Sequence, residues 1–128
     1  MAKYVPRKGD LIALSFDPQS GHEQRGRRPA LVISNYLFNK HTRLAIVCPI
    51  TNRDRKIPFH LPVPASSSVA GFVMVDQVKS IDYVARKAKF IEKAPEKLLS
   101  DTLGALDVCL NWQGPLSHPL LWSDHGCA

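Results

Sequence analysis

Residues 21 to 34, GHEQRGRRPALVIS, gather groups that could hold a phosphate. Arg25, Arg27, Arg28 and the carboxylate of Glu23 stand just before an apolar run. A guanidinium is a planar fork of donors that matches phosphate oxygens, and it stays charged near neutral pH. Arg28 directly precedes a proline and an expected buried strand, so its backbone is expected to be held firmly. The segment predicts a phosphate-binding loop, against the alternative of an ordinary solvated loop.

A second basic group follows in CPITNRDRK. Thr51 ends an expected strand, and Arg53, Arg55 and Lys56 come directly after it. A hydroxyl at a strand end can point into a groove, although many such threonines only satisfy their own backbone. Basic residues are thus gathered at two places in the chain, and both could meet an anionic ligand.

A third candidate is VDQVKSID, where Asp76 and Gln77 interrupt an apolar run and Lys79 adds a cation. Polar residues at such a break form a turn or bulge, or join a buried polar network. Taken alone, the pattern favours a structural role for Asp76 and Gln77.

Histidines could serve as base and acid in RNA cleavage without a metal. His22, His41 and His60 are expected in loops or at strand ends, and His22 neighbours Glu23. No spacing indicates a metal pair, so we expect neither a metal nor another cofactor. Adventitious metal uptake could involve three residues of the tail: His118, His125 and Cys127.

Composition indicates one globular domain. The chain has 128 residues, 45% of them hydrophobic and 22% charged, with no apolar run long enough to span a bilayer. Its net charge of +6 favours an anionic partner, nucleic acid above all. The three cysteines form no C-x-x-C pair, which is typical of a reduced interior. We therefore expect a cytoplasmic protein.

Several short strands are expected around these candidates, with a charged loop over residues 17–28, one or two helical turns over 36–42 and a flexible connection at 66–68. The expected strands are 10–16, 29–35, 43–51, the edge strand 59–64, two strands within 69–82 on either side of the break at 76–77, and 86–94. Five to seven strands then form a small, mostly antiparallel, barrel-like α+β domain.

The spacing of apolar residues changes from that of strands to that of a helix near the C-terminus. Leu99, Leu103, Leu106 and Leu110 recur at helical spacing after Pro95, which predicts an amphipathic helix covering one face of the sheet. We expect a domain over residues 1–111 and an extension over 112–128 that is loosely docked or disordered.

Three blocks of this sequence resemble the MazF/PemK family, the toxin endoribonucleases of type II toxin–antitoxin pairs. They are GDLIALSFDPQSGHEQRGRRPALVIS, FNKHTRLAIVCPIT and VDQVKSID, in the family's order and spacing. The resemblance implies an SH3-like barrel of the CcdB/PemK type, a homodimer, a cognate antitoxin, and RNA cleavage without a metal.

The resemblance also implies roles for particular residues. Arg28 and Thr51 are the catalytic pair, with Glu23 and Gln24 in the same active loop. The groove-shaping block matches three residues: Asp76, Gln77 and Lys79.

The chemistry of such cleavage can be argued from the residues. The ribose 2′-hydroxyl attacks the phosphate, so the enzyme must accept the hydroxyl proton, stabilise the negative charge on phosphorus and protonate the leaving 5′-oxygen. Arg28 suits the charge, Thr51 can orient the phosphate, and Glu23 or His22 is the proton acceptor. The cations expected to guide the RNA strand are Arg25, Arg27 and Arg53.

Single-stranded RNA is the expected substrate, because bases can be read in a fixed groove only when they are splayed from a helix. Two alternatives remain at this point: a non-catalytic nucleic-acid-binding barrel and a gyrase-poisoning toxin on the same fold.

Overall fold

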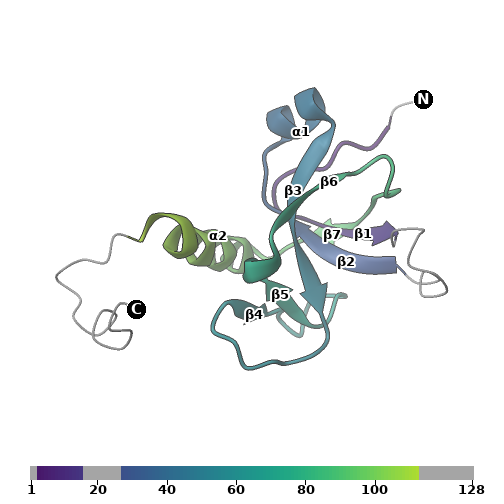
Figure 1. Cartoon of the computed structure of the whole chain (residues 1–128). Coiled ribbons are helices and arrows are strands. Elements are labelled where there is room, and N and C mark those ends of the chain that lie inside the picture. The colour runs from purple at the N-terminus through teal and green to yellow at the C-terminus, as the bar shows by residue number, and fades with distance from the viewer. Residues whose placement is uncertain (1–2, 16–26, 113–128) are drawn as a thin grey trace.

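The computed structural model describes residues 3–15 and 27–112 (Figure 1). In chain order the elements are β1 (Asp10–Ser15), β2 (Arg27–Val32), α1 (Tyr36–Thr42), β3 (Leu44–Thr51), β4 (His60–Pro62), β5 (Phe72–Met74), the 3-10 turn η2 (Val75–Gln77), β6 (Lys79–Asp82), β7 (Lys89–Lys93) and α2 (Glu96–Asn111). Every expected strand and both helical segments are present.

The strands form one antiparallel sheet in the order β4-β5-β3-β2-β1-β7, with β6 also paired to β3. The prediction of five to seven antiparallel strands with a C-terminal helix is confirmed. The expected barrel, however, is open: among the described residues, β4 and β7 end the order and are not paired with each other. β4 carries Pro62 and lies at an edge, as predicted for a strand containing proline.

β3 is the centre of the sheet, with β2 along one side and β5 and β6 sharing the other. β5 pairs with the end of β3 and β6 with its beginning, so the segment β5-η2-β6 runs beside the whole strand. Ile50 pairs with Val73 and Val47 with Lys79, which leaves two residues of β3 opposite five of the neighbouring segment. η2 takes up this extra length and carries Asp76 out of the ladder.

Apolar side chains pack on both faces of the sheet. The helix-side cluster lies under α2 and includes Leu11, Leu31, Cys48, Ile50 and Leu98. The opposite cluster includes Ile12, Ala30, Val32, Val47 and Tyr83. Alternate residues of β1, β2 and β3 supply the two clusters, as expected when both faces of a strand are covered.

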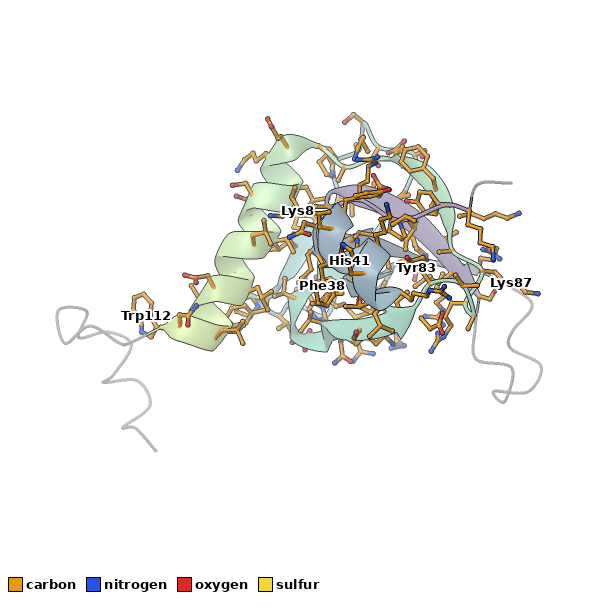
Figure 2. The ribbon with its side chains drawn as sticks, turned by 90° about the horizontal axis from the view of Figure 1, so that it is seen from above. Lys8, Phe38, His41, Tyr83, Lys87 and Trp112 are labelled. Atoms are coloured by element: carbon orange, nitrogen blue, oxygen red, sulfur yellow. The ribbon has the colours of Figure 1, made fainter. Side chains whose placement is uncertain are left out.

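α2 covers the helix-side cluster with its first three turns, as far as Leu106. Leu99, Leu103 and Leu106 pack against the cluster, whereas Leu110 is 70% exposed. The prediction that Leu110 belongs to the buried face is therefore wrong. The reason is geometric: the end of the helix extends beyond the sheet, and Trp112 lies at its far tip (Figures 1 and 2).

Two further expectations need correction. Arg27 and Arg28 are the first residues of β2 and not part of the preceding loop, because they pair with Ser15 and Leu14 of β1. The connection at 66–68, expected to be flexible, is tied to Glu92 of β7, whose carboxylate accepts hydrogen bonds from both Ser67 and Ser68.

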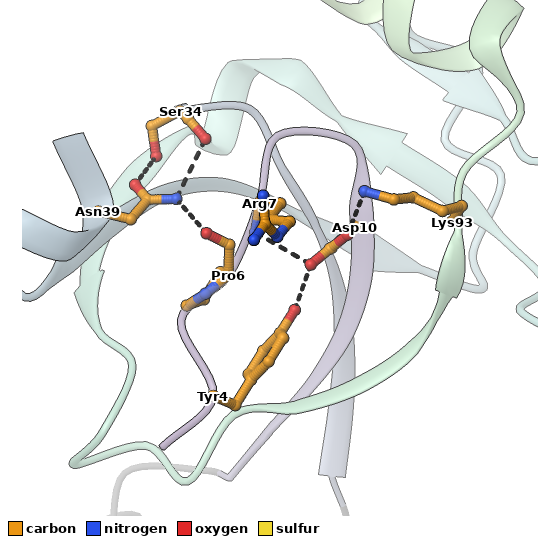
Figure 3. A network of polar contacts seen from close by, with 7 residues as sticks. All are labelled: Tyr4, Pro6, Arg7, Asp10, Ser34, Asn39 and Lys93. Atoms are coloured by element: carbon orange, nitrogen blue, oxygen red, sulfur yellow. Dashed lines mark hydrogen bonds and ion pairs between the residues drawn. The ribbon is translucent and has the colours of Figure 1, made fainter. Parts of the chain in front are cut away.

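The N-terminal segment is fastened to the sheet by a buried carboxylate (Figure 3). Asp10 is 2% exposed and accepts hydrogen bonds from the Tyr4 hydroxyl, from the Arg7 amide at 3.0 Å and from Lys93 Nζ at 2.7 Å. Burial, and secondly the bond to Asp10, raises the pKa of Tyr4 well above its usual range. Asp10, the second residue of the first motif block, therefore connects the N-terminal segment to β7.

No helix within the described ranges has both the length and the apolar character needed to cross a membrane.

Candidate active site

The pairing of β2 with β3 places Arg28 and Thr51 beyond the same end of the ladder between the two strands. The last assigned pair at this end joins Ala30 to Pro49, and Arg28 and Thr51 stand two residues further along each strand. Residues two apart share a face of a strand, so both positions lie on the face of the opposite cluster, to which Ala30 belongs. Arg28 is exposed and Thr51 half-buried. Two central strands of the sheet thus carry a guanidinium and a hydroxyl beyond the same end of their ladder.

The Thr51 hydroxyl is oriented by its own loop. Its Oγ1 accepts a hydrogen bond from the Arg53 amide at 3.2 Å. This is the local backbone contact that threonines at strand ends often make. A hydroxyl that accepts one bond keeps its own proton to donate, so this contact leaves Thr51 able to bond a phosphate oxygen.

Gly71 lies against the backbone of Thr51. A Cβ built at position 71 would stand well inside 3.0 Å of the Thr51 carbonyl oxygen, closer than real Cβ atoms approach other atoms. Gly71 also has a φ of +132°, a conformation that residues with a side chain rarely adopt. Only glycine lets this loop pass so close to the end of β3.

The Arg27 guanidinium makes contacts within the protein. It donates to Ser15 Oγ at 3.0 Å, to the Ala13 carbonyl at 3.2 Å and to the Lys87 carbonyl. These bonds join β1 to the turn before β7. The guanidinium is thus engaged within the protein, and the contact of Arg27 with RNA stays a prediction.

His60 of β4 and Asp76 of η2 form a pair on the β5 side of β3. His60 Nε2 is 2.8 Å from Asp76 Oδ1, and the two side chains are 3% and 40% exposed. Because a carboxylate only accepts, the proton of this bond lies on Nε2. His60 Nδ1 is buried and has no hydrogen-bond partner among the described residues. An unpaired buried polar atom costs about 1–3 kcal/mol of folding stability, so the unpaired Nδ1 of His60 destabilises the fold.

The charge of Asp76 also acts on a neighbouring thiol. Burial, and secondly Asp76, raises the pKa of Cys48 to about 12. Cys48 lies in β3 within the helix-side cluster. It is therefore a neutral core residue, as the apolar run around it predicted.

Exposed cations follow Thr51 in the chain, and another, Lys79, lies opposite Val47 of β3. Within the described ranges, Arg53, Arg55, Lys56 and Lys79 are exposed, and none of them forms an ion pair with a carboxylate. No group of three potential metal ligands was found in residues 3–15 and 27–112. Four predicted site residues, His22, Glu23, Gln24 and Arg25, lie outside the described residues.

Comparison with known families decides the identity of the fold. A model described as PemK-like, MazF-like toxin of type II toxin-antitoxin system matches residues 7–110. The chain belongs to this family. The MazF-like toxin is 41% identical over 99 residues to the endoribonuclease toxin MazF of Escherichia coli (strain K12), which covers 77% of this chain and 88% of that one. It is 36% identical over 107 residues to the endoribonuclease PemK of Escherichia coli, with 80% of each chain covered.

A solved structure supports the same assignment. The MazF-like toxin matches a chain of the MazE-MazF (Form-II) crystal structure from Deinococcus radiodurans with a TM-score of 0.76 and 37% identity, over 85% of this chain and 98% of that one. The resemblance predicted from the three motif blocks is confirmed, and the chain is a MazF-like endoribonuclease toxin.

Sequence reasoning missed Gly71 and the partner of His60 in this toxin. Gly71 carried a weak signal, since a lone glycine before a strand often marks a close backbone approach. His60 was considered only as one of several loop histidines. Its link to Asp76 spans 16 residues and required the pairing of β4 with β5 to become visible.

Proposed function

We propose that this MazF-like toxin cuts single-stranded messenger RNA at specific sequences, without a metal ion, by attack of a ribose 2′-hydroxyl on the adjacent phosphate. The products would be a 2′,3′-cyclic phosphate and a 5′-hydroxyl. The observation that carries the proposal is that Arg28 and Thr51 lie beyond the same end of the β2–β3 ladder, in a chain whose relatives are endoribonucleases.

The proposed roles follow from the chemistry of each group. Arg28 stabilises the negative charge that develops on the phosphate, and an oriented donor of this kind is worth roughly 10²–10³ in rate. Thr51 orients the phosphate through its hydroxyl proton. Thr51 is too weak an acid to yield an effective base, so the proton acceptor is Glu23 or His22, which precede β2 in the chain. The leaving 5′-oxygen takes up a proton as its bond to phosphorus breaks.

The surrounding charges suit a single strand of RNA. Arg53 and Lys79 are exposed and unpaired with carboxylates among the described residues, so they can meet phosphates on either side of the cleaved bond. Gln24 and Arg25 would extend this basic surface, with Gln77 among the groups that meet bases. Bases of a single strand can splay onto such a surface, whereas those of a helix cannot.

Two macromolecular partners complete the proposal. The first is a second copy of the chain, because large apolar side chains such as Leu37, Phe90 and Leu110 are exposed in the single chain. The second is a cognate antitoxin with an acidic segment, attracted by the net charge of +6 and competing with RNA for the same surface. A MazE-MazF structure from Deinococcus radiodurans supports a partner of this kind. We expect the toxin to act in the cytoplasm, where messenger RNA is translated.

The test is incubation of the purified protein with a long unstructured RNA in excess EDTA, followed by analysis of the product ends. We expect discrete fragments with 2′,3′-cyclic phosphate and 5′-hydroxyl ends. Binding without cleavage would instead favour a non-catalytic nucleic-acid-binding protein. Cleavage that disappears in EDTA would contradict the proposed chemistry.

A further inference from the structure

The starting observation is the unequal environment of the two His60 nitrogens. Nε2 bonds the Asp76 carboxylate at 2.8 Å, whereas Nδ1 is buried with no partner among the described residues. An apolar side chain would fill this space without leaving a polar atom unpaired. Packing therefore does not explain the histidine, and its bond to Asp76 is the one feature that an apolar residue could not supply.

The second observation is that His60 bonds only one of the two carboxylate oxygens of Asp76. Oδ1 is taken by the imidazole, and the described residues give Oδ2 no hydrogen bond. The Asp76 side chain is 40% exposed, although its partner is almost fully buried. One carboxylate oxygen is thus anchored to the protein, while the other remains available as an acceptor that cannot donate.

The third observation is where Asp76 sits. η2 lifts it out of the ladder between β5 and β6, and β5 pairs with the end of β3 that carries Thr51. Lys79, an exposed cation, follows three residues later. A carboxylate beside cations that attract phosphates would repel the RNA backbone, so its useful contact with RNA is with a base.

The geometry points to Asp76 as a specificity-determining residue that accepts a hydrogen bond from the exocyclic amino group of one RNA base, and to His60 as the positioning residue that fixes its carboxylate. Such an acceptor favours adenine, cytosine or guanine over uracil, whose exocyclic groups are carbonyl oxygens and would face the carboxylate unfavourably. This inference rests on the proposed ribonuclease function and deepens it.

The experiment maps cleavage sites in an RNA pool of random sequence by sequencing the new ends. Four variants are compared with the wild type: Asp76→Asn, His60→Phe, His60→Gln and Leu61→Ala. Asp76→Asn exchanges an acceptor for an amide whose NH₂ can meet a uracil carbonyl. His60→Gln keeps a donor near Nε2, whereas His60→Phe removes it. Leu61→Ala loosens the same strand without touching Asp76.

We expect the wild type to disfavour uracil at one position of its site by about tenfold or more. Asp76→Asn should lower that discrimination at the same position by about tenfold and leave the other positions unchanged. His60→Phe should also lower the discrimination against uracil at that position, whereas His60→Gln should keep most of it. Leu61→Ala should lower the melting temperature without changing the base preference.

The inference is overturned if Asp76→Asn, which changes an exposed side chain and is expected to fold, cleaves with the wild-type preference at every position. It is also overturned if Leu61→Ala shifts the preference as much as His60→Phe does, since the effect would then come from loosened packing. A wild-type protein that cuts no RNA would instead contradict the proposed function itself.

Discussion

The Thr51 carbonyl oxygen occupies the place where a side chain at position 71 would begin, so the end of β3 and Gly71 fit together only because Gly71 has no Cβ. This contact links a backbone turn 20 residues downstream to the position of the proposed phosphate-orienting hydroxyl. Added bulk at position 71 would therefore press on the Thr51 end of β3.

Gly71→Ala is expected to lower the free energy of unfolding by roughly 1–3 kcal/mol, because alanine must adopt a positive φ or push β3 aside. Displacement of Thr51 should also slow RNA cleavage. Urea unfolding and a single-turnover cleavage assay measure the two effects.

Gly104→Ala is the matched control for this prediction. Gly104 lies within α2, and a Cβ there would meet no atom within 4 Å. The substitution should leave cleavage unchanged and stabilise the protein by about 0.5–1 kcal/mol, since alanine is the better helix former. Equal losses in both variants would contradict a specific role for Gly71.

Arg27 and Arg53 should separate into a structural and an RNA-binding arginine. Arg27→Ala removes three hydrogen bonds within the protein and should cost about 1 kcal/mol of stability. Arg53→Ala should leave stability unchanged, weaken RNA binding and lower the salt slope of the binding constant by about 0.7. Melting curves and salt titrations of RNA binding distinguish them. A reversed pattern would show that Arg27 meets the RNA.

Glu92 should make the 66–69 connection sensitive to acid. Hydrogen bonds from the Ser67 and Ser68 side chains, and then from the Ser68 amide, hold the pKa of Glu92 below its usual value. A lowered folded-state pKa means that the contribution is present above the ordinary pKa near 4.5 and is lost as the pH falls. The exchange protection factor of the Ser68 amide should therefore drop on acidification.

The Val63 amide serves as the internal control for this measurement, because it bonds the Gly71 carbonyl at 2.8 Å and no carboxylate. Its protection factor should change less over the same pH range. Glu92→Gln should remove the pH dependence at Ser68, and an unaltered dependence in that variant would contradict the assignment.

The hydroxyl of Thr51, and not its methyl group, is expected to matter for cleavage. Thr51→Ser keeps the hydroxyl and should retain most of the cleavage rate, whereas Thr51→Ala should lose most of it. Single-turnover rates on the same RNA give the comparison. Equal activity of the serine and alanine variants would mean that the phosphate is oriented by another group.

Local patterns predicted the elements well, and contacts distant in the sequence account for what they missed. β3 and α2 were expected because their apolar periods are long and regular. Leu110 fits the helical period but lies on the part of α2 beyond the sheet, a fact of tertiary packing. The serines at 67 and 68 read as a flexible connection because their partner, Glu92, lies 24 residues or more away.

Some residues of the candidate site were likewise predicted from local patterns, whereas others depend on contacts distant in the sequence. Arg28 and Thr51 were identified from the basic motif and the strand end, and the family resemblance assigned their roles. The guanidinium of Arg27 could not be assigned from the sequence, since it bonds the carbonyl of Lys87, 60 residues away. The link from His60 to Asp76 likewise depends on the pairing of β4 with β5.

The most direct test of the central claim is the single-turnover cleavage rate of Arg28→Ala on an unstructured RNA in EDTA, with Arg53→Ala as a cation control. Circular dichroism and light scattering should first show that both variants keep the fold and assembly of the wild type. We predict that Arg28→Ala loses roughly 10²–10³ in rate at saturating RNA, whereas Arg53→Ala regains the wild-type rate when RNA is in excess. Wild-type cleavage by Arg28→Ala would contradict the account and would mean that the site lies elsewhere on the toxin.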